Sequence, residues 1–411
     1  MTSVLEILQG HPDWAATLGV LQCLQRSGHR ALLAGGCVRD ALRGVTAQDL
    51  DVATSATPDQ VISLFVKTVE VGKSFGVVRV LEKGADLEVA TFRKDSSSGD
   101  GRRPDSIEFS DEKNDALRRD FTVNALFFDP VSNEVLDYVE GLKDLRGACL
   151  RTVGEPQRRF QEDRLRILRA VRFAVQLDFE IEAVTWAEIR RSVRDVLSVS
   201  QERIRDELFK LLKFGQGKRA WGLMNRSDLW GTLFPELSPL EASEAADLQR
   251  LISVPTDNRV EAFSRLFAVW GMTPLTESVI DRLRLGKNEE KSLKTRLRWA
   301  FDLSSIWMLS RGERVLTYDD PDVRAGMDLW EERRGASEER DLLHQEWAAL
   351  TVEGKLPAPF LTGDDLKAVL QGPLIGQVLR EAYRRQLEGE LTSRDAALTW
   401  FSGWSKLNGG K

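Results

Sequence analysis

The pattern of apolar and polar positions divides the chain into a mixed first third and a helical remainder. Aliphatic residues recur at helical spacing over 4–30, with a break near Pro12, and a capping Thr57 opens a second helix that runs to about Val66. From about residue 150 the spacing is helical to the end. Short apolar or alternating runs bounded by turn residues predict strands at 31–34, from Asp49 onward, 69–72, 76–81 and 86–92. The pattern therefore predicts a small α/β sheet followed by helices.

Length and composition narrow the class of protein. A chain of 411 residues is too long for one core, so several subdomains are expected. With 42% hydrophobic and 30% charged residues, and no apolar run near the ~20 residues of a membrane span, a soluble protein without membrane attachment is expected. The first residues lack the basic start and apolar core of a signal peptide, which predicts a cytoplasmic location. Three widely spaced cysteines and three histidines favour neither a disulfide framework nor a zinc site.

Charge is unevenly distributed along the chain. The net charge is −6, yet residues 151–172 contain seven arginines and three acidic residues. A basic strip on an acidic protein fits local contact with RNA or a nucleotide, although a solvated helix face would have the same composition. The strip is therefore a candidate nucleic-acid or nucleotide contact.

A glycine pair follows the first predicted strand. Gly35 and Gly36 allow the backbone to turn tightly and to approach a ligand without an obstructing Cβ atom. The residues from Val38 to Leu42 are expected to begin a helix, so backbone amides and Arg39 would face the turn. An anion is the expected occupant.

Two aspartates follow the glycine turn. In a strand, side chains alternate between faces, so Asp49 and Asp51 would share one face while Leu50 and Val52 take the other. Two carboxylates on one rigid face suit Mg²⁺, which prefers oxygen ligands and bridges to substrate phosphates. An edge strand with a solvated acidic face would give the same pattern. The position shortly after the glycine turn favours the metal.

These residues together resemble a known family. Gly35-Gly36-Cys37-Val38-Arg39-Asp40, followed by Asp49-Leu50-Asp51-Val52-Ala53-Thr54, resembles the nucleotidyltransferase head of class II tRNA nucleotidyltransferases and bacterial poly(A) polymerases. The resemblance extends over most of the chain. It implies an α+β protein with a small mixed-sheet, polymerase-beta-like head and an all-α neck, body and tail. The implied domains are a head at 1–147, a neck and body with a nucleotide-selecting helix at 148–260, and a tRNA-binding body and tail at 261–411.

The resemblance adds residues to the site of the head. Glu88 would be a third carboxylate beside Asp49 and Asp51, and Arg119 would reach a triphosphate. Asp120 and Asn124 would orient the ribose or a loop, with a structural capping role equally open. The junction motif from Asp137 to Asp144 has a packing or turn role as its alternative to a catalytic one.

The segment 93–106 is rich in serine, glycine and charge, and resembles the flexible loop of complete CCA-adding enzymes. Such a loop is expected to act as a lever that re-angles the neck before the last A is added. A passive surface loop is the alternative. Shortening 95–101 is expected to spare CC addition and to remove the final A.

A third motif lies in the basic strip. Residues 162–173 are expected to form one continuous helix, with Leu165, Leu168 and Val175 facing inward. Asp163 and Arg166 would be neighbours on its surface because they are three residues apart. A carboxylate accepts hydrogen bonds and a guanidinium donates them, which matches the shared edge of cytosine and adenine but not that of guanine or uracil. A surface ion pair is the alternative.

The resemblance implies template-independent addition of CCA to tRNA from CTP and ATP, with Mg²⁺ as cofactor and no obligate protein partner. Addition of the terminal A alone, or poly(A) synthesis, are the alternatives. The catalytic residues would be Asp49, Asp51 and Glu88, of which Asp49 and Asp51 bind the metal. The expected nucleotide-binding residues are Gly36, Arg39, Arg119, Asp163, Arg166, Arg169 and Arg172.

Overall fold

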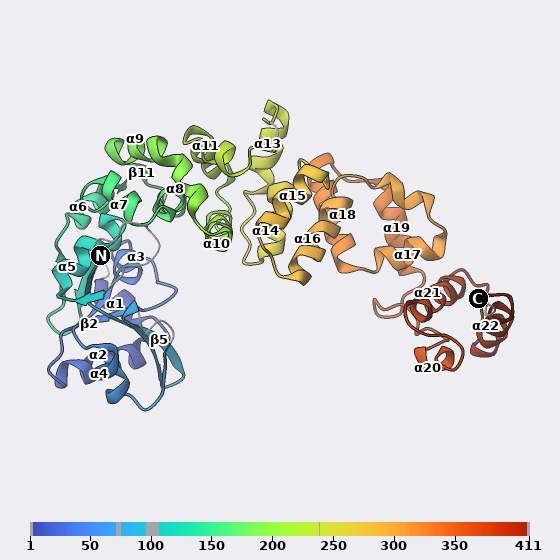
Figure 1. Cartoon of the computed structure of the whole chain (residues 1–411), viewed down its shortest axis with the longest axis horizontal. Coiled ribbons are helices and arrows are strands. Elements are labelled where there is room, and N and C mark those ends of the chain that lie inside the picture. Colours follow the sequence, from blue (N-terminus) through green and yellow to red (C-terminus); the bar gives the residue numbers. More distant parts are fainter. Residues whose placement is uncertain (1–2, 71–74, 96–106, 238, 409–411) are drawn as a thin grey trace. The chain divides into compact units, whose positions relative to one another are not determined.

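A computed structural model describes residues 3–70, 75–95, 107–237 and 239–408 (Figure 1). The chain forms two compact units, the first made of 1–211 with 219–235 and the second of 212–218 with 236–411. Each unit is described by itself. Of the loop predicted over 93–106, residues 96–106 lie outside the described ranges, as do residues 71–74.

The first unit is built on a seven-stranded sheet with the strand order β3-β4-β5-β2-β1-β8-β9. β2 pairs with β5 in parallel and the other neighbouring pairs are antiparallel, so the predicted mixed sheet is confirmed. Its strands are β1 (Ala31–Ala34), β2 (Val52–Thr54), β3 (Thr68–Val69), β4 (Val77–Glu82), β5 (Ala85–Thr91), β8 (Leu126–Asp129) and β9 (Glu134–Asp137). Two short ribbons accompany it: β6 (Arg93–Asp95) with β7 (Ile107–Phe109), and β10 (Cys149–Leu150) with β11 (Glu180–Ile181).

Helices alternate with the strands of this sheet, and further helices follow it in the chain, beginning within the basic strip 151–172. Those beside the sheet are α1 (Val4–Gln9), α2 (Trp14–Arg26), α3 (Gly36–Leu42), α4 (Pro58–Leu64), α5 (Glu112–Arg118), η2 (Thr122–Asn124) and α6 (Gly141–Arg146). The following ones are α7 (Pro156–Glu162), α8 (Leu165–Leu177), α9 (Ala183–Ser192), η3 (Val193–Ser198), α10 (Gln201–Leu212), α11 (Gly217–Arg226) and α12 (Leu229–Leu233). We call α7 to α10 the neck.

Strand alternation positions the head core as the sequence predicts. In β5, Leu87 and Val89 are buried while Glu88 between them is exposed. The two apolar residues join one cluster with Leu21 and Leu24 of α2. The hairpin between β4 and β5 turns at Lys83, which has a positive φ as a tight hairpin requires.

Two predicted elements differ in detail. β2 begins at Val52, so Asp49 and Asp51 precede the strand rather than lie in it. The amide of Ala34 still donates to the carbonyl oxygen of Asp51 at 3.1 Å, which holds this approach beside β1. Leu50 is buried and Asp49 is exposed, so the two sides of the segment differ as expected.

The predicted continuous helix over 162–173 is wrong. α7 ends at Glu162, and Asp163 has an extended backbone with φ of −150° before α8 begins at Leu165. The Asp163 carboxylate accepts a hydrogen bond from the amide of Leu165 at 3.1 Å. Aspartate competes for backbone amides in this way, which favours the start of a helix over its interior. Leu165 and Leu168 are buried, as predicted.

The second unit is helical in its described part, apart from one isolated bridge between Val352 and Lys355. Six of its tryptophans pack in two apolar clusters, which confirms the packing role expected for them: Trp299, Trp307, Trp330 and Trp347 in one, Trp400 and Trp404 in the other. The helices of the unit are α13 (Ala242–Leu251), α14 (Arg259–Phe267), α15 (Pro274–Arg282), α16 (Lys287–Trp299), η4 (Ser304–Met308), α17 (Arg311–Tyr318), α18 (Pro321–Arg334), α19 (Glu338–Ala348), α20 (Gly363–Leu366), α21 (Pro373–Leu387) and α22 (Arg394–Asn408).

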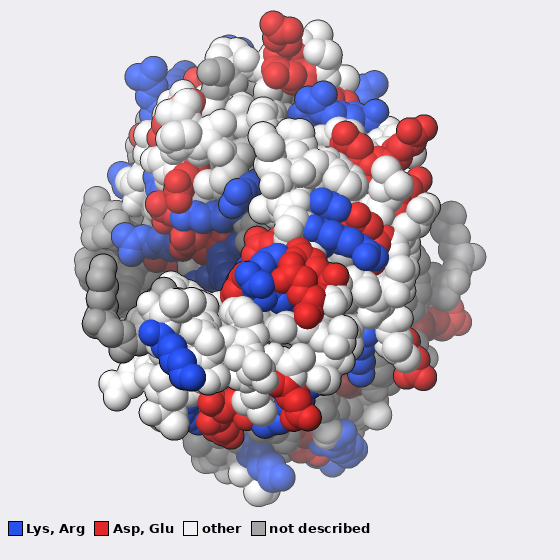
Figure 2. Space-filling view, turned by 90° about the vertical axis from the view of Figure 1, so that its right-hand side faces the viewer, with Lys and Arg blue, Asp and Glu red and all other residues white. Residues whose placement is uncertain are grey.

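Charges of both signs are mixed at the C-terminal end of the chain. Figure 2 shows basic and acidic side chains side by side on that face, with no large patch of one sign. Ion pairs near the end of the chain include Arg385 with Glu390 and Arg394 with Asp365. Across the described ranges, no helix is long and apolar enough to cross a membrane.

Candidate active site

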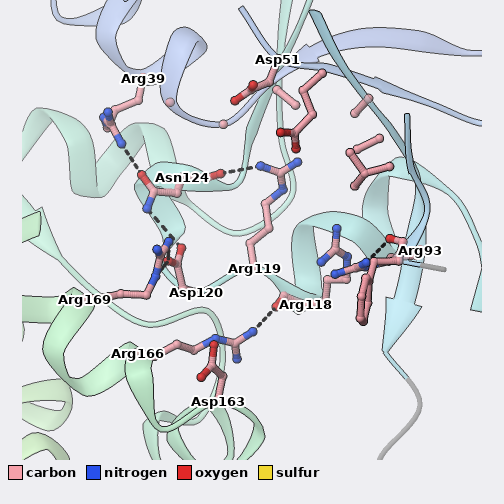
Figure 3. A pocket seen from close by; sticks show the side chains of 18 of the residues that line it. Arg39, Asp51, Arg93, Arg118, Arg119, Asp120, Asn124, Asp163, Arg166 and Arg169 are labelled. Atoms are coloured by element: carbon pink, nitrogen blue, oxygen red, sulfur yellow. Dashed lines mark hydrogen bonds and ion pairs between the residues drawn. The ribbon is translucent and has the colours of Figure 1, made fainter. Parts of the chain in front are cut away.

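A cavity of about 520 Å³ lies within the first unit, between the sheet and the neck. It is lined by the turn after β1, by β2, β4 and β5, by the segment after α5, and by α8 and α10 (Figure 3). Of the predicted site residues, those that line it are Gly36, Arg39, Asp51, Glu88, Arg119, Asp163, Arg166, Arg169 and Arg172. Asp49 is the one predicted site residue outside this lining.

The glycine turn brings the backbone close to an arginine of the cavity. Gly35 has φ of +75°, and a Cβ atom there would lie 2.8 Å from Nη1 of Arg119. α3 begins at Gly36, two residues earlier than expected. Arg39 is almost fully buried, and its guanidinium donates to Oδ1 of Asn124 at 2.5 Å and to Oδ1 of Asp40 at 2.8 Å. Arg39 therefore supports the turn as well as lining the cavity.

The head contributes a wall of carboxylates. Burial, followed by the charges of Glu88 and Asp49, raises the pKa of Asp51 to about 6 against the opposing charge of Arg119. The negative charges of Glu88 and Asp49 therefore lie close enough to act on the carboxylate of Asp51. Within the described ranges, no hydrogen bond or ion pair occupies the side chains of Asp49, Asp51 and Glu88.

The sequence predicts a hard divalent cation at these carboxylates. Free carboxylate oxygens that repel one another are relieved by a cation with oxygen ligands, as Mg²⁺ prefers. Among the described residues, however, no three His, Cys, Asp or Glu side chains are gathered closely enough to hold a metal. The Mg²⁺ ligand set derived from the sequence stays a prediction.

Arg119 is fixed beside the carboxylates. Its Nη2 atom pairs with Asp115 at 3.0 Å and Nη1 donates to the carbonyl oxygen of Asn124 at 3.1 Å. Its guanidinium also lies 4.9 Å from the ring centroid of Phe127. Burial alone would raise the pKa of Asp115, but Arg119 and Arg118 outweigh it and lower that pKa. These contacts fix the position of the Arg119 guanidinium at the cavity.

A chain of contacts crosses from the head to α8. Asn124, which accepts from Arg39, donates to Oδ1 of Asp120 at 3.1 Å. Oδ2 of Asp120 accepts from Nη2 of Arg169 at 2.6 Å (Figure 3). Burial pushes the pKa of Asp120 upward, but the charge of Arg169 and the hydrogen bonds that Asp120 accepts from Arg169 and Asn124 lower this pKa to about 2. Asp120 and Asn124 thus connect the head to the neck, a role that the sequence did not indicate.

α10 supports the arginines of α8 through a residue that sequence reasoning missed. Glu207 is almost fully buried and pairs with Arg172 at 2.7 Å and with Arg169 at 3.4 Å. Arg172 also lies over Phe173, 3.7 Å from the ring centroid. Burial lowers the pKa of Arg172 to about 10 although Glu207 opposes this. Glu207 stands next to the apolar face of α10. An acidic residue at such a position needs a cationic partner when it is buried, and this was the signal available in the sequence.

Asp163 and Arg166 both line the cavity, brought there by the turn between α7 and α8. Oδ2 of Asp163 pairs with Nη2 of Arg203 at 2.8 Å. Arg166 donates to Glu162 at 2.9 Å and to the carbonyl oxygen of Arg118 at 3.0 Å. The amide of Arg166 donates to the carbonyl oxygen of Asp163 at 3.0 Å, so the two residues are neighbours, but they do not lie on one helical face as expected. Arg203 also lines the cavity and was missed by the sequence reasoning.

The junction motif lies outside the cavity lining. Asp137 accepts hydrogen bonds from the amides of Val139, Gly141 and Leu142, which is a turn role. Asp144 accepts from the hydroxyl of Thr122 at 2.7 Å. These contacts favour the packing and turn roles left open from the sequence.

Comparison with known proteins gives a consistent match. The family model described as "Poly A polymerase head domain" matches residues 31–151, and "Probable RNA and SrmB- binding site of polymerase A" matches 178–240. The CCA-adding enzyme of Bacillus pumilus is 34% identical over 92% of this chain and 94% of its own length. Poly(A) polymerase I of Haemophilus influenzae is also 34% identical, over 76% of this chain and 78% of its own.

Solved structures agree on the fold. The Bacillus stearothermophilus CCA-adding enzyme in complex with CTP superposes with a TM-score of 0.76 at 26% identity, over 97% of this chain and 98% of that one. The Thermotoga maritima CCA-adding enzyme complexed with tRNA has a TM-score of 0.59 at 20% identity, over 97% of both chains, which supports the fold alone. Both confirm the α+β class, with a mixed head sheet followed by helices.

Proposed function

This chain belongs to the nucleotidyltransferase family of CCA-adding enzymes and bacterial poly(A) polymerases, and we propose that it completes tRNA 3′ ends with C, C and A. The substrates are CTP, ATP and a tRNA that lacks part or all of the sequence. One observation carries the proposal: one cavity is lined both by Asp51 and Glu88 of the head and by Asp163 and Arg166 of the neck. A single site of this kind suits two nucleotides and no template.

In the proposed reaction the 3′ hydroxyl of tRNA attacks the α-phosphorus of the nucleotide and pyrophosphate leaves. Asp49 and Asp51, with Glu88 as a third carboxylate beside them, would hold Mg²⁺ through the two aspartates, and the ion would supply charge neutralisation at the reacting phosphates. Arg119, fixed by Asp115, and the backbone of the glycine turn orient the triphosphate on the same side.

The neck selects the base in this proposal. The carboxylate of Asp163 accepts from the amino group of cytosine or adenine, while Arg166 donates to the adjacent ring nitrogen. Guanine and uracil present a carbonyl and a ring N–H in the reversed order. The acceptor Asp163 would then face a carbonyl acceptor, and the donor Arg166 would face an N–H donor. Arg169 and Arg172 contribute positive charge along the same wall.

Poly(A) synthesis is the second candidate, favoured by the equal identity to the Haemophilus influenzae polymerase. Addition of the terminal A alone is a third, because the same cavity would serve it. The identity to CCA-adding enzymes over nearly the whole chain supports complete CCA addition above both.

Product sequencing tests the proposal. The protein is incubated with tRNA transcripts that end before CC, after CC and after CCA, in the presence of CTP and ATP. We expect CCA, A and no addition, respectively. An adenylate ladder on unrelated RNA would assign poly(A) synthesis, and addition only to the transcript that ends in CC would assign an A-adding enzyme.

A further inference from the structure

We propose that Arg203 of α10 is a positioning residue that determines base specificity, because its ion pair with Asp163 keeps that carboxylate from pairing with Arg166. The inference rests on the proposed function and adds a residue to it. Arg203 lines the cavity but belongs to a helix about 40 residues beyond the Glu-Asp-x-x-Arg motif.

The two reading residues are held by different partners. Asp163 uses Oδ1 for the amide of Leu165 and Oδ2 for Arg203. Arg166 is engaged by the carboxylate of Glu162 and by the carbonyl oxygens of Arg159 and Arg118. In the part of the chain that the structure describes, no hydrogen bond or ion pair joins the side chains of Asp163 and Arg166.

Separate partners leave hydrogen-bonding capacity for a base. A carboxylate has about four acceptor positions and a guanidinium has five N–H donors. Two acceptor positions on Asp163 and three donated bonds from Arg166 are accounted for. If the two side chains instead paired with each other, a bidentate contact would consume the edge that must face the base. Arg203 therefore prevents the most favourable competing contact.

The main role of the ion pair between Arg203 and Asp163 is not to stabilise the fold. The side chains of Arg203 and Asp163 are 45% and 27% exposed, and pairs this accessible contribute little to folding. Glu207, one helical turn beyond Arg203, holds Arg169 and Arg172 in the same wall. Along one face, α10 thus supports both the selecting carboxylate and the arginines beside it.

The test compares Arg203→Gln with Arg203→Lys, which keeps a positive charge, and with Arg194→Gln, which removes an exposed arginine just before α10. The ratio of kcat/KM is measured for CTP over UTP on tRNA ending before CC, and for ATP over GTP on tRNA ending in CC. Binding of all four nucleotides is measured by calorimetry, and Tm by thermal unfolding.

We expect Arg203→Gln to lower both ratios by about tenfold, since a charge-assisted hydrogen bond is lost. The same ratios should fall in the binding constants. Arg203→Lys should recover part of the discrimination, and Arg194→Gln should retain all of it. Tm should change by less than about 2 °C, as for other accessible ion pairs.

Unchanged ratios in Arg203→Gln would overturn the inference. So would an equal loss for all four nucleotides, because that result would make Arg203 a phosphate ligand. The unmodified protein separates this failure from that of the proposed function: if it never adds C, CCA addition is wrong. The ratio of kcat/KM for ATP over GTP, measured on whichever RNA the protein does extend, would then still decide the role of Arg203.

Discussion

The two walls of the cavity treat their charges in opposite ways. On the head wall, Asp51 and Glu88 have no hydrogen-bond or ion-pair partner among the described residues, and burial with mutual repulsion raises the pKa of Asp51. On the neck wall, Arg169 and Arg172 are each held by a buried carboxylate. One wall thus has unsatisfied charge and the other has paired charge.

The difference indicates what each wall is prepared to bind. Unpaired, crowded carboxylates gain most from an added cation, whose charge offsets their repulsion. Paired guanidiniums lose little flexibility when a ligand arrives, because their geometry is already fixed. In the proposed function, the head wall would therefore take a cation with phosphates, and the neck wall would take a base through its shape and hydrogen bonding.

Removing the head carboxylates should have the largest effect. Asp49→Ala or Asp51→Ala should lower kcat/KM for both C and A addition by about a thousandfold or more, because both additions depend on one charge-stabilising centre. Primer extension with CTP or ATP alone measures it. Glu134→Gln, at an exposed edge strand, is the control. Near-normal C addition by either variant would contradict a shared centre.

Changing the reading pair should affect choice more than binding. Asp163→Ala and Arg166→Ala should weaken rejection of GTP and UTP by roughly 10- to 100-fold, because each removes one member of the hydrogen-bonding edge. Misincorporation kinetics measure the change, with affinity for the triphosphate moiety followed through pyrophosphate inhibition. If both variants reject GTP and UTP as strictly as the parent, selection resides elsewhere.

The contact that joins the walls should make stability depend on pH. The pKa of Asp120 falls from its ordinary 3.8 to about 2, so its ionised form stabilises the fold by about 2 kcal/mol at neutral pH. A lowered pKa gives stability that is present above pH ~4 and is lost as the pH falls towards 2. Asp120→Asn should remove it. Urea unfolding of the full chain should give a difference between parent and variant that shrinks by about half from pH 6 to pH 3.

The smallest effect is expected at the outer edge of the neck wall. Arg158→Gln removes an exposed partner of Glu162, which keeps Arg159 and Arg166. Activity and base choice should stay within about twofold of the parent, as for other accessible ion pairs. Steady-state kinetics with CTP and ATP measure this. A large loss of selectivity would mean that Glu162 cannot hold Arg166 in place without its contact to Arg158.

Local motifs were predictable because they depend on short-range chemistry. Gly35 and Gly36 follow a buried strand, and the pair Asp49 and Asp51 surrounds a buried leucine, all of which can be seen in the sequence. The break at Asp163 was not predicted. An aspartate within an arginine-rich helical pattern is compatible with either a helix interior or a break between helices. The extended backbone of Asp163 and the hydrogen bond that its carboxylate accepts from the amide of Leu165 decide for the break.

The sequence by itself determined that a small sheet comes first and helices follow, because alternation, helical spacing and glycine turns are local properties, and it indicated the residues proposed for the chemistry. Only the tertiary structure decided which charges are paired. Glu207 meets Arg172 and Arg203 meets Asp163 across 35 to 40 residues of sequence, since α10 packs along the wall that α8 begins. Such pairings depend on the packing of whole helices, which no short stretch of sequence specifies.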